Sequence, residues 1–194
     1  MQKLKVLSGS LKGRVLSTPP AIKGNQNFTP SLIKEAVFSI LDSLEMEGKL
    51  NKQTSVFVDL FAASGQMGLE AFSRGFSRSV LFELSSERFR VLKKNMQDIA
   101  PDLEVYHRDA FRFYKEINCE NVETLVYFLD LPYSFWNGSS KEKIYKLTEN
   151  ILNSSLPGKK MLILQAGENP NWENFEVKRY RNNYLLIKTD ATFT

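Results

Sequence analysis

The chain has 194 residues, with 26 Lys and Arg against 22 Asp and Glu and a formal net charge of +4. Its hydrophobic fraction of 42% and charged fraction of 25% are typical of a globular protein that buries a full core without disulfides or metal ions. One cysteine, Cys119, excludes an internal disulfide, and with one histidine in the chain a multi-ligand Cys/His zinc site is excluded too. We therefore predict no metal site.

No stretch approaches the roughly 18 apolar residues of a membrane span. The first 16 residues also lack the apolar segment and small-residue cleavage site of a signal peptide. We expect a cytoplasmic protein with no membrane partner.

The positive charge is concentrated near the N-terminus. Residues 1–34 contain six Lys and Arg and no Asp or Glu, whereas residues 35–194 contain 20 Lys and Arg against 22 Asp and Glu. A basic arm on a nearly neutral body predicts a polyanionic partner.

The N-terminal segment has a composition unlike the rest of the chain. Two short apolar pieces, Val6-Leu7 and Val15-Leu16, flank a turn-rich segment, which predicts a small β-hairpin followed by a loop. Thr29 and Pro30 then resemble a helix N-cap followed by proline at the first helical position. Apolar residues follow at helical spacing, so we predict a helix that ends near Gly48.

From residue 55, short apolar runs alternate with amphipathic segments. The predicted strands are 56–60, 80–83, 104–106, 125–130 and 161–164, and the predicted helices are 68–74, 86–99, 111–116 and 141–152. Two alternating runs within 175–189 predict a closing antiparallel hairpin. This order predicts an α/β fold with a mostly parallel, Rossmann-like sheet. We predict two units, a hairpin-and-helix extension (1–50) and the α/β domain (51–194).

The segment from Asp59 to Gly68 lies where the first strand turns into the first helix, a place where open α/β sheets bind ligands. The pattern Ala63-x-Gly65-x-x-Gly68 resembles a dinucleotide fingerprint whose first glycine is replaced. Alternatively, Asp59 suits S-adenosylmethionine, whose sulfonium and amino groups are cationic, better than a pyrophosphate. A plain turn capped by an aspartate is the third interpretation.

Two more carboxylates follow predicted strands. Glu83 ends the second strand, where a carboxylate can accept hydrogen bonds from both ribose hydroxyls of an adenosine group, or can be a solvated charge. Asp109 precedes Ala110 after the third strand, where it can reach an adenine amino group, cap the next helix, or do both.

The fourth strand of the domain ends in Asp130-Leu131-Pro132-Tyr133. An exocyclic amine has its lone pair delocalised into the base, so a methyltransferase must localise that pair. The Asp130 carboxylate and the Leu131 carbonyl can accept the amine hydrogens, and Tyr133 can stack on the base. The alternative is a strand that ends in an ordinary turn with a core aromatic residue.

These motifs stand in the same order as in a known family. The string Gly9-Ser-Leu-Lys12-Gly13-Arg14, residues 29–41, the string from Asp59 to Gly75, Glu83, Asp109-Ala110 and Asp130 to Tyr133 resemble the RsmD-type methyltransferases. That family methylates the exocyclic N2 of a guanine in bacterial small-subunit ribosomal RNA. The resemblance implies an S-adenosylmethionine-dependent methyltransferase fold, with ribosomal RNA or an assembling small subunit as partner.

The resemblance also implies roles for individual residues. The amine-binding residues are Asp130, Leu131, Pro132 and Tyr133. The S-adenosylmethionine site comprises Asp59, Phe61, Ala63, Gly65, Glu83, Leu84, Asp109 and Ala110. The RNA contacts are Lys12, Arg14, Thr29 and Lys34.

The chain departs from the family pattern in three places, one of them at Asn27 and Leu32, where the family commonly has basic residues. Ala63 stands where the family usually has glycine, and its methyl group would either crowd the cofactor or be accommodated by a negative φ. Leu131 stands where the family usually has proline. Two alternatives therefore stay open: an amino-methyltransferase for another substrate such as DNA adenine, and a catalytically disabled RNA-binding homologue. A nicotinamide-dependent oxidoreductase is disfavoured because the chain has no second domain for a substrate.

Overall fold

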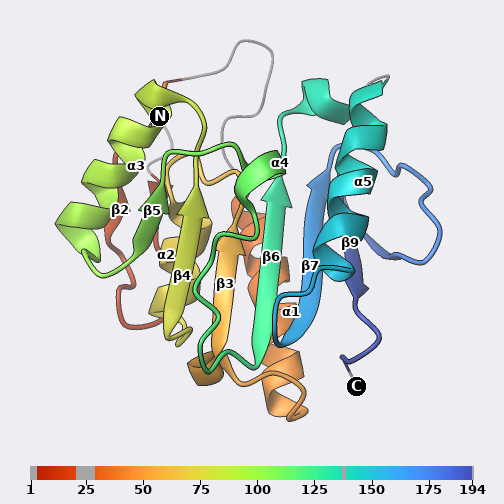
Figure 1. Ribbon diagram of the computed structural model, residues 1–194. Coiled ribbons are helices and arrows are strands. Elements are labelled where there is room, and N and C mark those ends of the chain that lie inside the picture. Colours follow the sequence, from red (N-terminus) through yellow and green to blue (C-terminus); the bar gives the residue numbers. More distant parts are fainter. Residues whose placement is uncertain (1–3, 21–28, 137–138, 194) are drawn as a thin grey trace.

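The computed structural model describes residues 4–20, 29–136 and 139–193, and a seven-stranded sheet lies at its centre (Figure 1). The strand order is β5-β4-β3-β6-β7-β9-β8. The pairs from β5 to β7 are parallel, whereas β9 pairs antiparallel with both β7 and β8. The strands are β3 (Ser55–Asp59), β4 (Arg78–Phe82), β5 (Glu104–Tyr106), β6 (Thr124–Asp130), β7 (Lys159–Ala166), β8 (Glu176–Tyr180) and β9 (Asn183–Thr189). The predicted α/β fold with a C-terminal antiparallel hairpin is confirmed.

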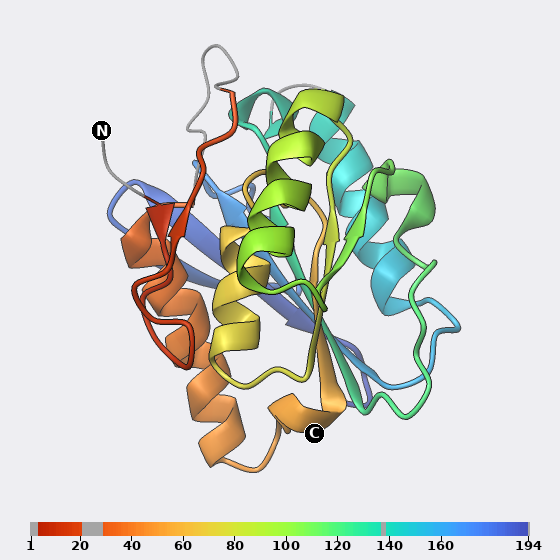
Figure 2. The same ribbon diagram turned by 90° about the vertical axis from the view of Figure 1, so that its left-hand side faces the viewer.

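Helices cover both faces of the sheet (Figures 1 and 2). On one face lie α1 (Ser31–Met46), α2 (Gln66–Ser73) and α3 (Ser86–Ile99), which bury their apolar residues against alternate residues of the strands. On the other face lie α4 (Ala110–Phe113) and α5 (Ser139–Leu152), and 3₁₀ turns occupy Lys52–Thr54 and Tyr133–Trp136. No helix among the described residues has the length and apolar character needed to cross a membrane.

The predicted start of α1 is wrong in its detail. The helix begins at Ser31 with Pro30 as its N-cap residue, and no side chain caps it. Thr29, the predicted capping residue, donates its hydroxyl to the carboxylate of Asp130 instead, at 2.6 Å. A tertiary partner has therefore displaced the local capping bond that the Thr-Pro-Ser pattern suggested.

The N-terminal hairpin packs on the outer side of α2. Strands β1 (Leu4–Lys5) and β2 (Val15–Leu16) pair antiparallel, which confirms the predicted hairpin although its first strand precedes Val6-Leu7. Leu4, Val6 and Leu16 join apolar side chains of α2 and α3 in one core. Gly9 has a φ of +81°, and a Cβ there would lie 1.7 Å from the carbonyl oxygen of Ser73. Only glycine allows this approach of hairpin to helix.

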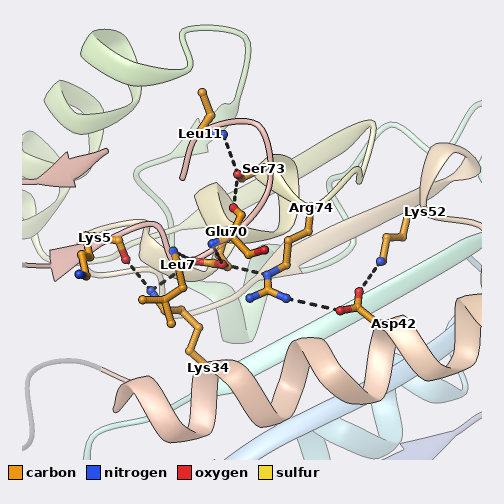
Figure 3. Close-up of polar contacts among 10 residues, drawn as sticks. Lys5, Leu7, Leu11, Lys34, Asp42, Lys52, Glu70, Ser73 and Arg74 are labelled. Atoms are coloured by element: carbon orange, nitrogen blue, oxygen red, sulfur yellow. Dashed lines mark hydrogen bonds and ion pairs between the residues drawn. The ribbon is translucent and has the colours of Figure 1, made fainter. Parts of the chain in front are cut away.

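A buried carboxylate, Glu70 of α2, joins this hairpin to α1 (Figure 3). It accepts hydrogen bonds from the amides of Leu7 at 2.7 Å and Ser8 at 2.9 Å and from Nε of Arg74 at 2.8 Å, and it lies 3.3 Å from the Lys34 ammonium. Lys34 also donates to the carbonyl of Lys5 at 2.8 Å. The predicted division at residue 50 stays a prediction, and these contacts connect the two sides of it.

Candidate active site

A cavity of about 850 Å³ opens at the carboxyl ends of the parallel strands. Open α/β sheets bind their ligands at this edge, and the volume lies in the range of small-molecule sites. Ten residues that the sequence placed at a cofactor or amine site line it: Asp59, Phe61, Ala63, Glu83, Leu84, Asp109, Ala110, Asp130, Leu131 and Pro132. The structure thus brings together motifs that lie up to 73 residues apart in the chain.

Three carboxylates share one face of the sheet, and the strand register explains why. Asp59 is paired across the ladder with Leu81 on one side and Phe128 on the other. Side chains two residues apart point to the same face of a strand. Glu83, directly after β4, and Asp130, the last residue of β6, each lie two residues beyond these partners, so they flank Asp59 on the same face.

This arrangement changes the protonation of Asp59. Burial raises the pKa of Asp59 to about 8, and the negative charges of Asp130 and Glu83 raise it too, against a hydrogen bond from the Phe61 amide at 3.2 Å. A cation bound among these carboxylates would favour their ionised forms. The carboxylates thus gather on one side of a cavity that Arg88, Arg108, Lys143 and Lys146 also line.

Glu83 orders the loop that follows β3. Its carboxylate accepts hydrogen bonds from the amide of Ala63 at 3.0 Å and from the amide of Ser85 at 2.8 Å. Ala63 has a φ of +50°, so it does not adopt the negative φ that would have accommodated its methyl group. The chain keeps the left-handed backbone that a glycine would adopt most easily.

Gly65 allows the same loop to pack closely on α3. It is the N-cap residue of α2, with a φ of +83°, and it is not among the residues that line the cavity, so its predicted cofactor contact stays a prediction. A Cβ at this position would lie 2.6 Å from a methyl group of Leu92 and 2.7 Å from that of Met96. The glycine is therefore required for close packing of the loop on α3.

Asp130 lies at the end of β6 with one oxygen already engaged. Thr29 donates to its Oδ2 at 2.6 Å. Burial raises the pKa of Asp130 to about 6, while the Thr29 hydrogen bond and the Arg88 charge lower it. The side chain of Tyr133 lies outside the described residues, so its predicted stacking role stays a prediction.

Asp109 caps the short helix α4, which was one of the roles open to it. Its carboxylate accepts a hydrogen bond from the amide of Phe111 at 3.0 Å. The residue also lines the cavity, so its contact with an adenine amino group stays a prediction.

Several cavity residues were missed in the sequence. Arg88 of α3 lines the cavity, its side chain is only 12% exposed, and its Nε lies 4.0 Å from the Glu83 carboxylate. Arg88 lies in the first turn of the helix that follows Glu83, and this closeness in the sequence could have indicated the contact. A second group comes from the opposite face of the sheet and had no local motif: Phe111, Lys143, Lys146 and Asn150.

The four predicted RNA contacts divide into two pairs. Lys12 and Arg14 are exposed on the hairpin and do not line the cavity. Lys34 and Thr29 are buried, and the Lys34 side chain, 3% exposed, is paired with Glu70. In this structure the polar groups of Lys34 and Thr29 are engaged in internal contacts, and the prediction that these two residues contact RNA stays a prediction.

Within the described part of the chain, no three His, Cys, Asp or Glu side chains come together as a potential metal site.

Comparison with solved structures confirms the fold class. The chain aligns with hypothetical protein TTHA0928 of Thermus thermophilus with a TM-score of 0.72, 24% identity and coverage of 95% of this chain and 98% of that one. It aligns with an RNA methyltransferase of Salinibacter ruber in complex with S-adenosyl-L-homocysteine with a TM-score of 0.58, 16% identity and coverage of 84% and 92%. The architecture is that of the Rossmann-like methyltransferases.

Sequence comparison identifies the family. Residues 4–182 match the family model described as Conserved hypothetical protein 95. The chain is 30% identical over 133 residues to YlbH of Bacillus subtilis, provisionally named an rRNA methyltransferase, an alignment that covers 67% of each protein. It is 29% identical over 134 residues to ribosomal RNA small subunit methyltransferase D of Buchnera aphidicola, covering 68% of this chain and 63% of that protein. The chain belongs to this family of RsmD-type methyltransferases, which confirms the resemblance noted in its motifs.

Proposed function

We propose that the protein is an S-adenosylmethionine-dependent methyltransferase that methylates the exocyclic N2 amine of a guanine in small-subunit ribosomal RNA. The observation that carries the proposal is the placement of Asp130 and Leu131 in the same cavity as Asp59 and Glu83. The cavity thus joins acceptors for an amine to carboxylates suited to a cationic donor. Membership of the family supports the RNA substrate.

The residues present fit S-adenosylmethionine. Asp59 and Glu83 offer carboxylates to its cationic groups and ribose hydroxyls, and Leu84 is an exposed apolar side chain beside them. The buried hydroxyl of Ser64 lines the cavity and has no hydrogen-bond partner within the described structure, so a polar ligand group there would satisfy it. When bound, the donor supplies a methyl group activated on a sulfonium.

The chain's own contribution is to prepare the amine. Asp130 Oδ1 and the Leu131 carbonyl accept its two hydrogens, which localises the nitrogen lone pair in the direction of the donor. The Asp130 carboxylate then receives the proton that the amine loses. Leucine in place of proline at position 131 retains the carbonyl that this step needs.

Methyl transfer to RNA tests the proposal. Small-subunit RNA from cells that lack the protein should accept a labelled methyl group, and nucleoside digestion should yield N2-methylguanosine. Asp130→Ala should abolish incorporation, whereas Asp98→Asn, at an exposed carboxylate of α3, should not. Label in a methylated adenine would instead identify another amino-methyltransferase. We infer that the protein acts in the cytoplasm on free ribosomal RNA or on an assembling small subunit.

A disabled RNA-binding homologue is the second candidate, and the strained Ala63 backbone in the cofactor loop favours it. Calorimetry separates the two candidates. Binding of S-adenosylmethionine or S-adenosylhomocysteine supports the enzyme, and absence of binding to both supports the disabled homologue.

A further inference from the structure

Thr29 connects three parts of the molecule: the start of α1, the start of α2 and the end of β6. It precedes α1, lines the cavity and is buried. Its hydroxyl donates to Asp130 Oδ2 at 2.6 Å, and its carbonyl accepts a hydrogen bond from Gln66 Nε2 at 3.1 Å. Gln66 is the first residue of α2, directly after the loop that lines the cavity. The hydroxyl and the carbonyl of Thr29 are thus both bonded to residues that line the cavity.

The hydrogen bond from Thr29 to Asp130 takes the place of a local capping bond to α1. A threonine before a helix ordinarily accepts an amide hydrogen from the first turn, but α1 has no side-chain cap. Loss of a local preference at a cavity residue is expected where function has overridden it. The hydroxyl serves Asp130 in place of the helix.

Thr29 is also a stiff donor. The residue before a proline is confined to extended backbone conformations, and the β-branched side chain restricts rotation about χ1. With Pro30 following it and Gln66 holding its carbonyl, Thr29 presents its hydroxyl from a fixed position.

We propose that Thr29 is a positioning residue that locks the Asp130 carboxylate, occupying Oδ2 so that Oδ1 is left to accept the substrate amine. The inference rests on the proposed function and extends it to a residue that the family motif at the strand end does not include. Without this bond the carboxylate can rotate, and both its orientation and its charge are less well defined.

The charge of Asp130 also depends on this bond. Hydrogen bonding from Thr29 lowers the pKa of Asp130 against the effect of burial. The other charged groups that face the cavity are Asp59 from β3, Glu83 directly after β4, Arg88 from α3, Arg108 and Asp109 from the segment before α4, and Lys143 and Lys146 from α5. Because Thr29 donates directly to the carboxylate, its removal should raise the pKa of Asp130 while leaving the other groups in place.

Thr29→Val removes the hydroxyl and keeps the shape. We expect kcat for methyl transfer to fall about tenfold or more at pH 7, with donor affinity unchanged. The acid limb of the kcat profile should move about one pH unit higher, because the carboxylate protonates more readily. Thr29→Ser should restore both. Thr148→Val, at a buried threonine of α5 that donates to the Tyr145 carbonyl, is the matched control and should change neither.

A direct titration keeps this test independent of activity. Carboxyl-carbon NMR of aspartate-labelled protein, with Asp130→Asn to assign the resonance, should show a higher Asp130 pKa in Thr29→Val than in the wild type or Thr29→Ser. An unchanged Asp130 pKa overturns the inference, as does a Thr29→Ser variant as slow as Thr29→Val. If the wild type transfers no methyl group yet the Asp130 pKa still depends on the hydroxyl, the proposed function fails and the positioning contact stands. Thr29→Ala replaces Thr29→Val should the latter not fold.

Discussion

The amide of Ala63 donates a hydrogen bond to the Glu83 carboxylate at 3.0 Å, and the Ala63 backbone has a φ of +50°. The cofactor loop therefore keeps a left-handed conformation that an alanine adopts only at a cost of roughly 1–2 kcal/mol. Glu83 holds this conformation in place and is at the same time the carboxylate proposed to bind the donor ribose. Under the proposed function, one residue thus both orders the loop and binds the ligand.

Ala63→Gly should stabilise the protein. Glycine adopts a positive φ without the steric penalty, and its greater freedom in the unfolded chain offsets part of the gain, so we expect an increase of up to about 1 kcal/mol in the free energy of unfolding. Urea denaturation measures it. Ala62→Gly, at the buried neighbour outside the left-handed region, should destabilise. Equal losses in the two variants would contradict the strain at Ala63.

The buried carboxylates should make stability depend on pH. In the folded protein the pKa of Asp59 is about 8 and that of Asp130 about 6, both above the unfolded value of roughly 4. The folded state then binds more protons, so stability should fall as pH rises from about 4 to about 8, by at most about 1.4 kcal/mol per pH unit for each proton. Thermal unfolding across this range tests the sign.

Asp59→Asn is the matched variant for this dependence. It retains the shape and removes the titrating group, so its stability should fall less with rising pH than that of the wild type. S-adenosylhomocysteine, which lacks the sulfonium charge, should bind with a weaker pH dependence than S-adenosylmethionine. A steeper fall in Asp59→Asn would show that other groups control the titration.

The parts of the fold that depend on local pattern could be predicted from the sequence. Runs such as Leu125 to Asp130 alternate with amphipathic helices, and this periodicity determined the sheet, its helices and the strand ends that carry Asp59, Glu83 and Asp130. The predicted residues around the cavity follow from that topology because parallel strands end at one edge.

The roles of Thr29 and Lys34 could not be predicted in this way. Thr29 donates to a residue 101 positions away, and Lys34 pairs with Glu70 of a neighbouring helix. The hydrophobic periodicity of the sequence does not indicate either partner. A local cap and a surface charge were the natural expectations for these residue types. Tertiary packing replaced both.

Glu70→Ala should be strongly destabilising. It leaves Lys34 buried without its carboxylate and two hairpin amides without an acceptor, which should cost about 3–5 kcal/mol. Lys34→Met should cost less, because Glu70 keeps Arg74 and both amides. Lys49→Met, at an exposed pair with Glu47, should cost at most about 1 kcal/mol. Chemical denaturation ranks the three, and a Lys34→Met loss as large as that of Glu70→Ala would refute the central role of Glu70.

Lys12 and Arg14 are the exposed cations of the hairpin, and neutralising them should weaken RNA binding through phosphate contacts. Lys12→Gln with Arg14→Gln should reduce the slope of log affinity against log salt by about 2, since each phosphate contact contributes about 1. Affinity for S-adenosylmethionine should hold, because neither residue lines the cavity. Fluorescence anisotropy on small-subunit RNA fragments at several salt concentrations measures the slope.

The controls for this prediction are an exposed pair of cations outside the hairpin and the buried Lys34. Lys49→Gln with Arg181→Gln removes the same charge from exposed positions outside the hairpin and should leave the slope nearly unchanged. Lys34→Met should do the same where the protein stays folded, since that ammonium is already paired with Glu70 and releases no counterions from RNA. If Lys34→Met flattened the salt dependence as much as the hairpin pair, the hairpin would have to open on RNA and expose the Glu70 contacts, because in the closed arrangement that charge is out of reach of a phosphate.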